Sequence, residues 1–397
     1  MICILSRVKN FAKNPENLIY LAFISVFLHF VITGIVIAFV SVAALVQSET
    51  RKQIFSFKGK KAFIAFTLYS FFLALFSENF LGAAFSIGFF LILAISYFVR
   101  ANITEKTFEN CLDICCLAAI PLALSAVVEQ LFNNSVEGYN CKLWFFNENY
   151  FCSVLAAIVI ICAHKATSHK SAVFKYYVCA LFAALGLYLG QSMFAIVETF
   201  IGICILLILK KKHALLAVLV LVSAIGVFIV LAIPDIFPRL SEVNITSQRR
   251  IRIWNEAMPF IADSPIFGKG FLSYYFYARQ NPSMYQTAHA HNFAIEAMLS
   301  LGIVGTVILL MLIWSYYQKA MECKELLRSN TATTLILTLS TAVLVHTMTD
   351  LTLLWLQTGL LYALILGAIG IDERALNKRI YACATLGGAS DRKEEED

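Results

Sequence analysis

Long runs of apolar residues, separated by short polar segments, make up most of the 397-residue chain. A membrane-spanning helix needs about 20 apolar residues to cross a hydrocarbon core of about 30 Å. The first run, residues 17–47, would form a helix of about 46 Å, which is too long for one span. We therefore expect two short helices there, joined near Thr33 and Gly34.

Ten further runs have the apolar character of single spans: residues 61–77, 79–99, 111–131, 150–164, 172–189, 193–209, 213–233, 291–317, 331–348 and 350–371. With the first run counted as two helices, the pattern predicts an all-α, polytopic membrane helix bundle of about twelve transmembrane helices. Residues 1–233 would hold helices 1–9 and residues 291–371 helices 10–12. Between them lies one large extracytoplasmic loop, 234–290, and a cytoplasmic charged tail follows at 372–397.

The overall composition agrees with a membrane protein. Hydrophobic residues make up 60% of the chain and charged residues 14%, against roughly 45–50% and about 25% in soluble domains. This excludes a soluble domain, a disordered chain and a small disulfide scaffold. Most of the 11 cysteines lie inside apolar runs, which favours buried free thiols, and Cys141 has no second cysteine in its loop.

The distribution of basic residues predicts the orientation of the chain. With the N-terminus in the cytoplasm and twelve spans, 24 of the 31 Lys and Arg residues fall on the inner side. Counting residues 17–47 as one span would instead place the basic cluster at 48–60 outside, against the positive-inside rule. We therefore expect a multi-pass protein of the cell membrane with both termini cytoplasmic and no cleaved signal peptide. Because topology accounts for the net charge of +6, we expect no nucleic-acid partner.

The long outer loop is the exception to this charge pattern. Six of the seven outer basic residues lie in it: Arg239, Arg249, Arg250, Arg252, Lys269 and Arg279. Long loops cross the membrane largely regardless of their charge, so the charges alone leave open whether the loop merely tolerates them or uses them.

Residues 247–262 of this loop read as an amphipathic helix. Ile251, Trp254, Met258 and Ile261 recur at helical spacing, whereas Arg249, Arg252 and Glu256 fall on another face. Arg suits the recognition of phosphate, because its planar guanidinium binds phosphate oxygens through two parallel hydrogen bonds. The aromatic stretch 274–277 could either stack on sugar rings or anchor the loop at the membrane interface.

His289, His291 and Asn292 stand at the mouth of the next apolar run. Two histidines could bind a metal, but no Cys, Asp or Glu lies at ligand spacing in this stretch, so we expect no metal site and no cofactor. A neutral imidazole at the membrane surface is suited to removing a proton from a hydroxyl group. The competing interpretation is a histidine that caps the helix.

The order of these motifs resembles the O-antigen ligase and O-antigen polymerase superfamily. Three motifs of its pattern are present. They are an arginine four residues before a tryptophan (Arg250 and Trp254), the P-x-x-G-x-G turn at 265–270, and His291-Asn292 before a helix with a G-x-x-G motif at 302–305. Weaker similarities are the N-x-N stretch at 147–149 and the H-x-x-x-D of residues 346–350. Each motif alone is weak, but their order within about 60 residues is specific.

The resemblance implies a GT-C-like membrane glycosyltransferase for surface polysaccharide, acting as a ligase or a polymerase. Such an enzyme moves a glycan from undecaprenyl diphosphate to a hydroxyl of a glycan or lipid acceptor, with inversion and without a metal, in contact with membrane lipids. Carried over by position, Arg250 would hold the diphosphate and His291 would act as the general base. The remaining candidate substrate-binding residues are Arg249, Arg252, Trp254, Lys269, Arg279, His289 and Asn292.

One departure from the family pattern concerns Met193. Many ligases of the family have an arginine there as a second diphosphate contact, and this chain has no basic side chain at that position. The other loop cations could replace it, the donor geometry could be that of a polymerase, or the chain could be an inactive family member. A transporter or flippase for lipid-linked sugars is the main alternative, although the few intramembrane ionisable residues and the lack of an internal repeat argue against it.

Overall fold

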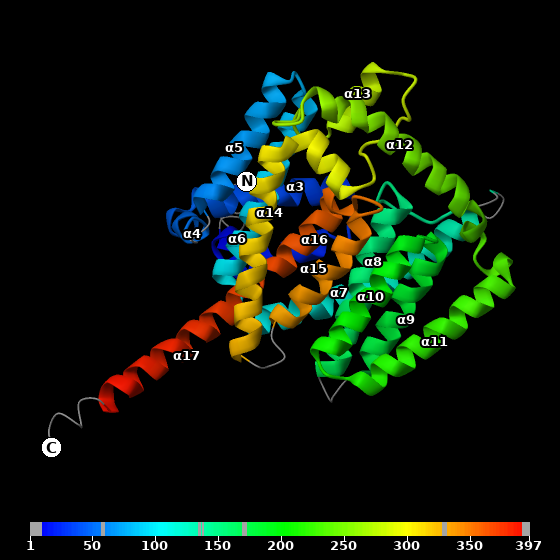
Figure 1. Ribbon diagram of the computed structural model, residues 1–397. Helices are drawn as coiled ribbons and strands as arrows, with labels where there is room; N and C mark the ends of the chain where they lie inside the picture. The colour runs from blue at the N-terminus through cyan, green and yellow to red at the C-terminus, as the bar shows by residue number, and fades with distance from the viewer. Residues whose placement is uncertain are drawn as a thin grey trace.

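The computed structural model describes residues 10–56, 60–133, 136, 139–168, 173–327 and 332–390. Every element in this part of the chain is an α-helix or a short 3₁₀ turn (Figure 1). The elements are α2 (Pro15–Ser25), α3 (Phe30–Val46), α4 (Ser48–Ile54), α5 (Lys60–Phe76), α6 (Phe80–Asn102), α7 (Glu105–Phe132), α8 (Glu148–Ser168), α9 (Val173–Gly190), α10 (Met193–Leu209), α11 (His213–Ala232), η1 (Pro234–Ile236), η2 (Pro238–Glu242), α12 (Val243–Asp263), α13 (Ser273–Gln280), α14 (Phe293–Leu327), α15 (Ala332–Thr347), η3 (Thr352–Leu354), α16 (Leu356–Gly367) and α17 (Ile369–Ser390).

Six of these helices are long and apolar enough to cross a membrane, or seven if the bent pair α3 and α4 counts as one span. The six are α6, α7, α8, α9, α11 and α14. The helices α10 and α15 are apolar but shorter, and α3 and α4 meet at an angle of 102°. The expected all-helical membrane class is thus confirmed, whereas the count of twelve spans stays a prediction.

The first apolar run does divide into two helices, but not where the sequence suggested. The break falls between α2 and α3, at residues 26–29, and Thr33 and Gly34 lie inside α3. The hydroxyl of Thr33 donates to the Ser25 carbonyl at 2.7 Å, and His29 caps α3 by accepting from the Val31 amide. With 11 residues, about 16 Å long, α2 cannot cross a hydrocarbon core of about 30 Å by itself.

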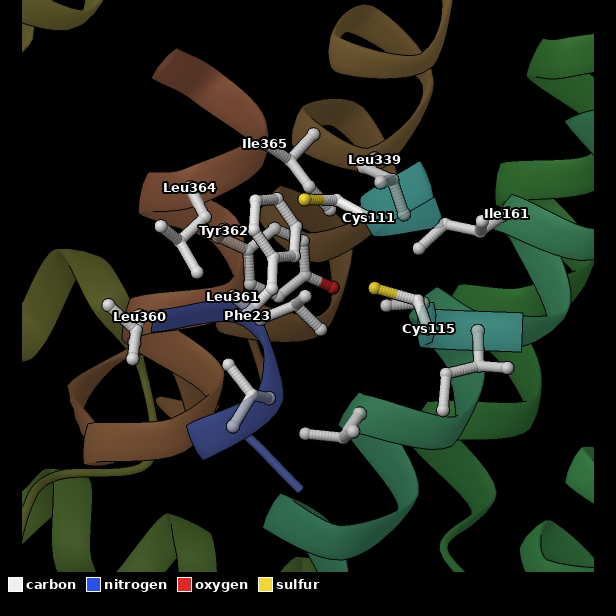
Figure 2. Packing of buried hydrophobic residues seen from close by; sticks show 14 of the residues in the cluster. Phe23, Cys111, Cys115, Ile161, Leu339, Leu360, Leu361, Tyr362, Leu364 and Ile365 are labelled. Atoms are coloured by element: carbon white, nitrogen blue, oxygen red, sulfur yellow. The ribbon is translucent and has the colours of Figure 1, made fainter. Parts of the chain in front are cut away.

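The main core lies where α2, α7, α8, α15 and α16 meet. Figure 2 shows Phe23 of α2 and Tyr362 of α16 packed beside Cys111 and Cys115 of α7, with Ile161 of α8 close by. These cysteines are free and buried, as the sequence indicated. The core therefore relies on shape and apolar contact, as expected for helices that must pack tightly within lipid.

Two parts of the chain stand apart from this core. The helix α11 has no buried residue and lies along one side of the bundle (Figure 1), so most of its surface is available to lipid. The long connection between α11 and α14 forms a cap at one end of the bundle, built from α12 and α13 (Figure 1). This cap carries most of the predicted site residues.

Candidate active site

The P-x-x-G-x-G turn fixes the cap to the bundle through backbone contacts. In α14, Gly302 interrupts the helix with a φ of 62°, which exposes backbone groups to the turn. The amides of Ile303 and Val304 donate to the carbonyls of Pro265 and Ile266 at 2.9 and 3.0 Å. A Cβ atom at either Gly268 or Gly302 would come within about 2.7 Å of the facing backbone. These glycines therefore serve close backbone packing rather than chemistry.

A side chain of α5 and the side chain of the residue just before α6 complete this attachment. The Tyr69 hydroxyl lies 2.8 Å from the carbonyl oxygens of both Phe267 and Leu301. Asn79 caps α6 and also donates to the Phe271 carbonyl at 2.8 Å. Lys269 belongs to this turn, which packs against α5 and α6, whereas Arg250 lies against α10.

The amphipathic helix of the cap is confirmed as α12, although its buried face differs from the predicted one. Ile251 and Met258 are about half exposed, and Ile253 and Ala257 are buried instead against α13 and α14. Trp254 lies beside this cluster and donates its indole N–H to the Ala290 carbonyl at 3.0 Å. The helix thus supports the backbone of the histidine segment.

The centre of the site is a contact between His291 and Asp350. The Nδ1 atom of His291 lies 2.9 Å from Oδ1 of Asp350, whose carboxylate is 2% exposed. Asp350 lies between α15 and η3, and its amide donates to the His346 carbonyl, which ends α15. The other ring nitrogen of His291, Nε2, lies 3.0 Å from the hydroxyl of Thr287. With Nδ1–H donated to the carboxylate, Nε2 carries the lone pair.

The N-x-N stretch at the start of α8 belongs to the same centre. Asn149 donates to the second carboxylate oxygen of Asp350 at 2.6 Å. Its own carbonyl oxygen accepts a hydrogen bond from Ser192 at 2.7 Å, at the residue before α10. Three distant segments of the sequence therefore meet at one buried carboxylate.

His289 has a different environment from His291. Its side chain is 3% exposed, its Nε2 lies 3.2 Å from the Tyr150 hydroxyl, and its Nδ1 accepts from the His291 amide. Burial, followed by the charge of His291, lowers the pKa of His289 to about 3, so its ring is neutral at pH 7. His289 therefore supports the backbone of its neighbour.

The backbone at His291 is held in an uncommon conformation, with a φ of 49° in the left-handed region. Glu296 stabilises the preceding turn by accepting from the Ala290 amide at 2.8 Å, and Ser300 donates to its other oxygen. Asn292 caps α14 by accepting from the amides of residues 294 and 295, and its side chain donates to the Met348 carbonyl. The helix-capping role that the sequence left open for the histidine thus falls to Asn292.

The charge on Asp350 is stabilised by its neighbours. Burial alone would favour the protonated carboxyl, but the imidazole of His291 beside it holds its pKa well below the usual range. An ionised Asp350 next to His291 orients the ring and stabilises the imidazolium that forms when Nε2 takes a proton. This is the arrangement that general-base catalysis requires.

His289, His291 and Asp350 also offer three potential metal ligands, whose atoms all lie within 4.8 Å of one another. The sequence argument against a metal overlooked Asp350, which comes 59 residues after His291. The hydrogen bonds favour a proton-transfer site over a metal site. Because Nδ1 of neutral His289 accepts from the His291 amide, its proton is on Nε2, the atom that would have to bind the metal.

Arg250 faces the bundle from α12. Its guanidinium carbon lies 4.6 Å above the ring centre of Phe194, at the start of α10. Burial lowers the pKa of Arg250, while Asp350 raises it, so the charge of Asp350 acts on this side chain. Because arginine is normally protonated far above neutral pH, the group stays charged at pH 7 despite this shift.

The other predicted cations occupy different surroundings. Arg239 is paired with Glu148 at 2.9 Å, and Arg252 with Glu256 at 2.7 Å. Arg279 is exposed on α13 and donates to the Tyr275 hydroxyl. Arg249 is exposed on α12. The structure thus brings Arg250, His289 and His291 to the bundle, and leaves Arg249, Arg252 and Arg279 on the surface of the cap.

The structure adds residues that the sequence did not single out as site residues: Tyr150, Phe194, Thr287 and Glu296. Two more, Asn149 and Asp350, had a signal in the N-x-N and H-x-x-x-D stretches. The aromatic stretch of α13 points mainly inward: Tyr274 is fully buried, and its hydroxyl donates to Glu256 at 3.0 Å. Neither sugar stacking nor interfacial anchoring describes that residue.

Comparison with known proteins agrees with the geometry. Residues 178–310 match the family model described as O-antigen ligase, a range that includes Arg250 and His291 and ends before Asp350. No curated protein matches the chain. Together with the apolar helices, the family match supports a multi-pass membrane protein with a segment similar to O-antigen ligases. Residues 178–310 are therefore similar to the O-antigen ligase family, in agreement with the resemblance that the motifs indicated.

Proposed function

We propose that the protein transfers a glycan from undecaprenyl diphosphate to an acceptor hydroxyl at the outer face of the cell membrane. The observation that carries this proposal is the His291–Asp350 contact beneath a helix that presents Arg250. A buried carboxylate, an oriented imidazole and a nearby guanidinium are the groups that such a transfer requires.

In this mechanism Nε2 of His291 accepts the proton of the acceptor hydroxyl, which takes the place of the Thr287 hydroxyl. The acceptor oxygen attacks the anomeric carbon and forms the new glycosidic bond with inversion. The bond from that carbon to the diphosphate breaks, and its electron pair leaves with undecaprenyl diphosphate. Arg250 stabilises the charge on this leaving group, and Asp350 stabilises the imidazolium.

The test is a surface-glycan ladder from a deletion strain complemented with variants of the full chain. His291→Ala and Arg250→Ala should each abolish long glycan chains at normal protein levels. His213→Ala and Arg51→Ala are matched controls, because both side chains are exposed on helices away from the cap, and they should give full ladders. Full ladders from both site variants would contradict the proposal.

The same gel separates the two activities of the superfamily. Loss of long chains with single units retained indicates a polymerase, and normal chains that accumulate on the lipid carrier indicate a ligase. A transporter predicts instead that repeat units remain on the inner leaflet in the deletion strain. An inactive family member predicts a full ladder in the deletion strain itself.

A further inference from the structure

The guanidinium of Arg250 is held by an aromatic ring rather than by a carboxylate. Its Cζ lies 4.6 Å from the Phe194 ring centre, well within the distance of about 6 Å for a cation–π interaction. In the described part of the chain no ion pair forms at Arg250, in contrast with Arg239 and Arg252, which each have a glutamate partner. Phe194 is thus the group that defines where this cation lies.

The Phe194 ring is itself backed by a buried polar pair. It stacks on the imidazole of His346, with ring centres 6.3 Å apart and an angle of 29° between the planes. Nδ1 of His346 lies 2.6 Å from Glu198, which follows Phe194 by one turn on α10. Glu198 also accepts from the Tyr362 hydroxyl, and both members of the pair are fully buried. The ring therefore rests on His346 of α15, whose partner Glu198 on α10 is itself held by Tyr362 of α16.

An aromatic partner has a chemical consequence for an arginine that must bind phosphate. A carboxylate would occupy the guanidinium N–H groups and compete with the diphosphate. An aromatic face contacts the plane of the guanidinium instead and leaves its five N–H donors, which lie in that plane, available for phosphate oxygens. This matters here because Met193, beside Phe194, supplies no second cation.

We propose that Phe194 is the positioning residue for Arg250. Its ring holds the plane of the guanidinium, so that the N–H edge of that group faces the lipid-linked diphosphate. The inference rests on the proposed function, in which Arg250 binds that diphosphate. It assigns Phe194 a role in donor binding and none in proton transfer.

The test measures equilibrium binding of undecaprenyl diphosphate to the full chain in lipid nanodiscs. Phe194→Leu removes the aromatic face and should weaken binding about 3- to 30-fold, the range expected for a partly desolvated cation–π contact. Phe194→Trp keeps an aromatic face and should stay within about twofold of the wild type. Phe200→Leu, the same change six residues further along α10, is the matched control and should bind like the wild type.

A double-variant cycle separates positioning from a general packing effect. If Phe194 acts through Arg250, Phe194→Leu has no further effect on binding in an Arg250→Ala background. Equal weakening by Phe194→Leu in both backgrounds overturns the inference, as does equal weakening by the Leu and Trp variants.

The outcomes also separate this inference from the proposed function. Weaker binding in Arg250→Ala with unchanged binding in Phe194→Leu overturns the role of Phe194 alone. Unchanged binding in Arg250→Ala overturns the diphosphate role of Arg250 and, with it, the inference. Size-exclusion profiles of all variants establish that each is folded before binding is compared.

Discussion

His291 and Asp350 are 59 residues apart in the sequence, yet Nδ1 of one lies 2.9 Å from Oδ1 of the other. The first stands at the entrance of α14 and the second follows α15, so neither helix alone forms the site. The contact is made on the side of the bundle where Asn149 and Ser192 also meet. Four segments must therefore pack correctly before the imidazole is oriented.

We predict that Asp350→Asn lowers the rate of glycan transfer at least about 100-fold, because the amide no longer stabilises the imidazolium of His291. The fold should persist, since an amide oxygen can still accept from Asn149. The measurement is the transfer rate of purified protein, with Asp235→Asn as the control, an exposed aspartate in η1. A rate within threefold of the wild type would contradict the assignment of Asp350.

The buried His289 predicts a pH dependence of stability. Burial lowers its pKa to about 3, whereas an unfolded histidine titrates near pH 6.5. The unfolded state therefore binds the proton first, and stability falls by about 1.4 kcal/mol per pH unit as the pH drops below about 6.5. Above that pH both states are neutral and the histidine contributes no slope.

The variant His289→Gln should remove this slope in thermal unfolding measured between pH 6.5 and pH 4, and His213→Gln should retain it. The lowered pKa of Asp350 also affects stability, but in a different pH range. Its stabilising effect is complete above the unfolded pKa of about 3.9 and is lost only at lower pH. The same slope in the wild type and in His289→Gln would show that His289 is not the group responsible.

The glycine contact between the cap and α14 predicts large effects from single methyl groups. Gly268→Ala or Gly302→Ala would force a Cβ against backbone atoms at a positive φ and should cost about 2–5 kcal/mol of stability. Gly88→Ala and Gly226→Ala are matched controls, since a Cβ at either meets nothing within 4 Å. These helical positions should gain up to about 1 kcal/mol. The measurement is the unfolding temperature of all four variants in the same detergent.

Glu198 predicts a difference between two substitutions at one position. Glu198→Ala leaves the Tyr362 hydroxyl and Nδ1 of His346 without their acceptor and should cost about 3–5 kcal/mol. Glu198→Gln retains an acceptor oxygen and should cost less than half as much. Thermal unfolding of the two variants measures this, and equal losses would mean that volume, and not hydrogen bonding, decides the stability.

The sequence predicted the helical membrane class and the amphipathic helix of the loop, because apolar run length and periodicity are local properties. It misplaced the first break, since His29 caps α3 through its imidazole, an interaction that hydropathy does not report. It identified only part of the packed face of α12, since Trp254 and Ile261 of the predicted stripe lie against the buried cluster and Ile251 and Met258 do not. That face depends on contacts with α13 and α14, and a stripe of apolar residues does not specify which neighbour will cover it.

The sequence singled out candidate site residues only in the long loop, and gave a weaker signal for the rest of the site. His291 and Arg250 stood out because they lie close to other motifs in one polar loop. Asp350 and Asn149 come from the edges of apolar runs, where a single polar residue is equally typical of a helix end. Phe194 gave no signal among 33 phenylalanines, and only its contact with the Arg250 guanidinium distinguishes it.

The left-handed backbone at position 291 has a consequence for what this residue can be. On conformational grounds glycine or asparagine would suit the position better, and an imidazole there costs about 1–2 kcal/mol. Neither alternative could accept a proton from a hydroxyl near neutral pH. Under the proposed function, the fold thus retains a locally unfavourable residue for its chemistry, and His289 supports its backbone by accepting from the His291 amide. In this proposal His289 holds the backbone, and His291 accepts the proton.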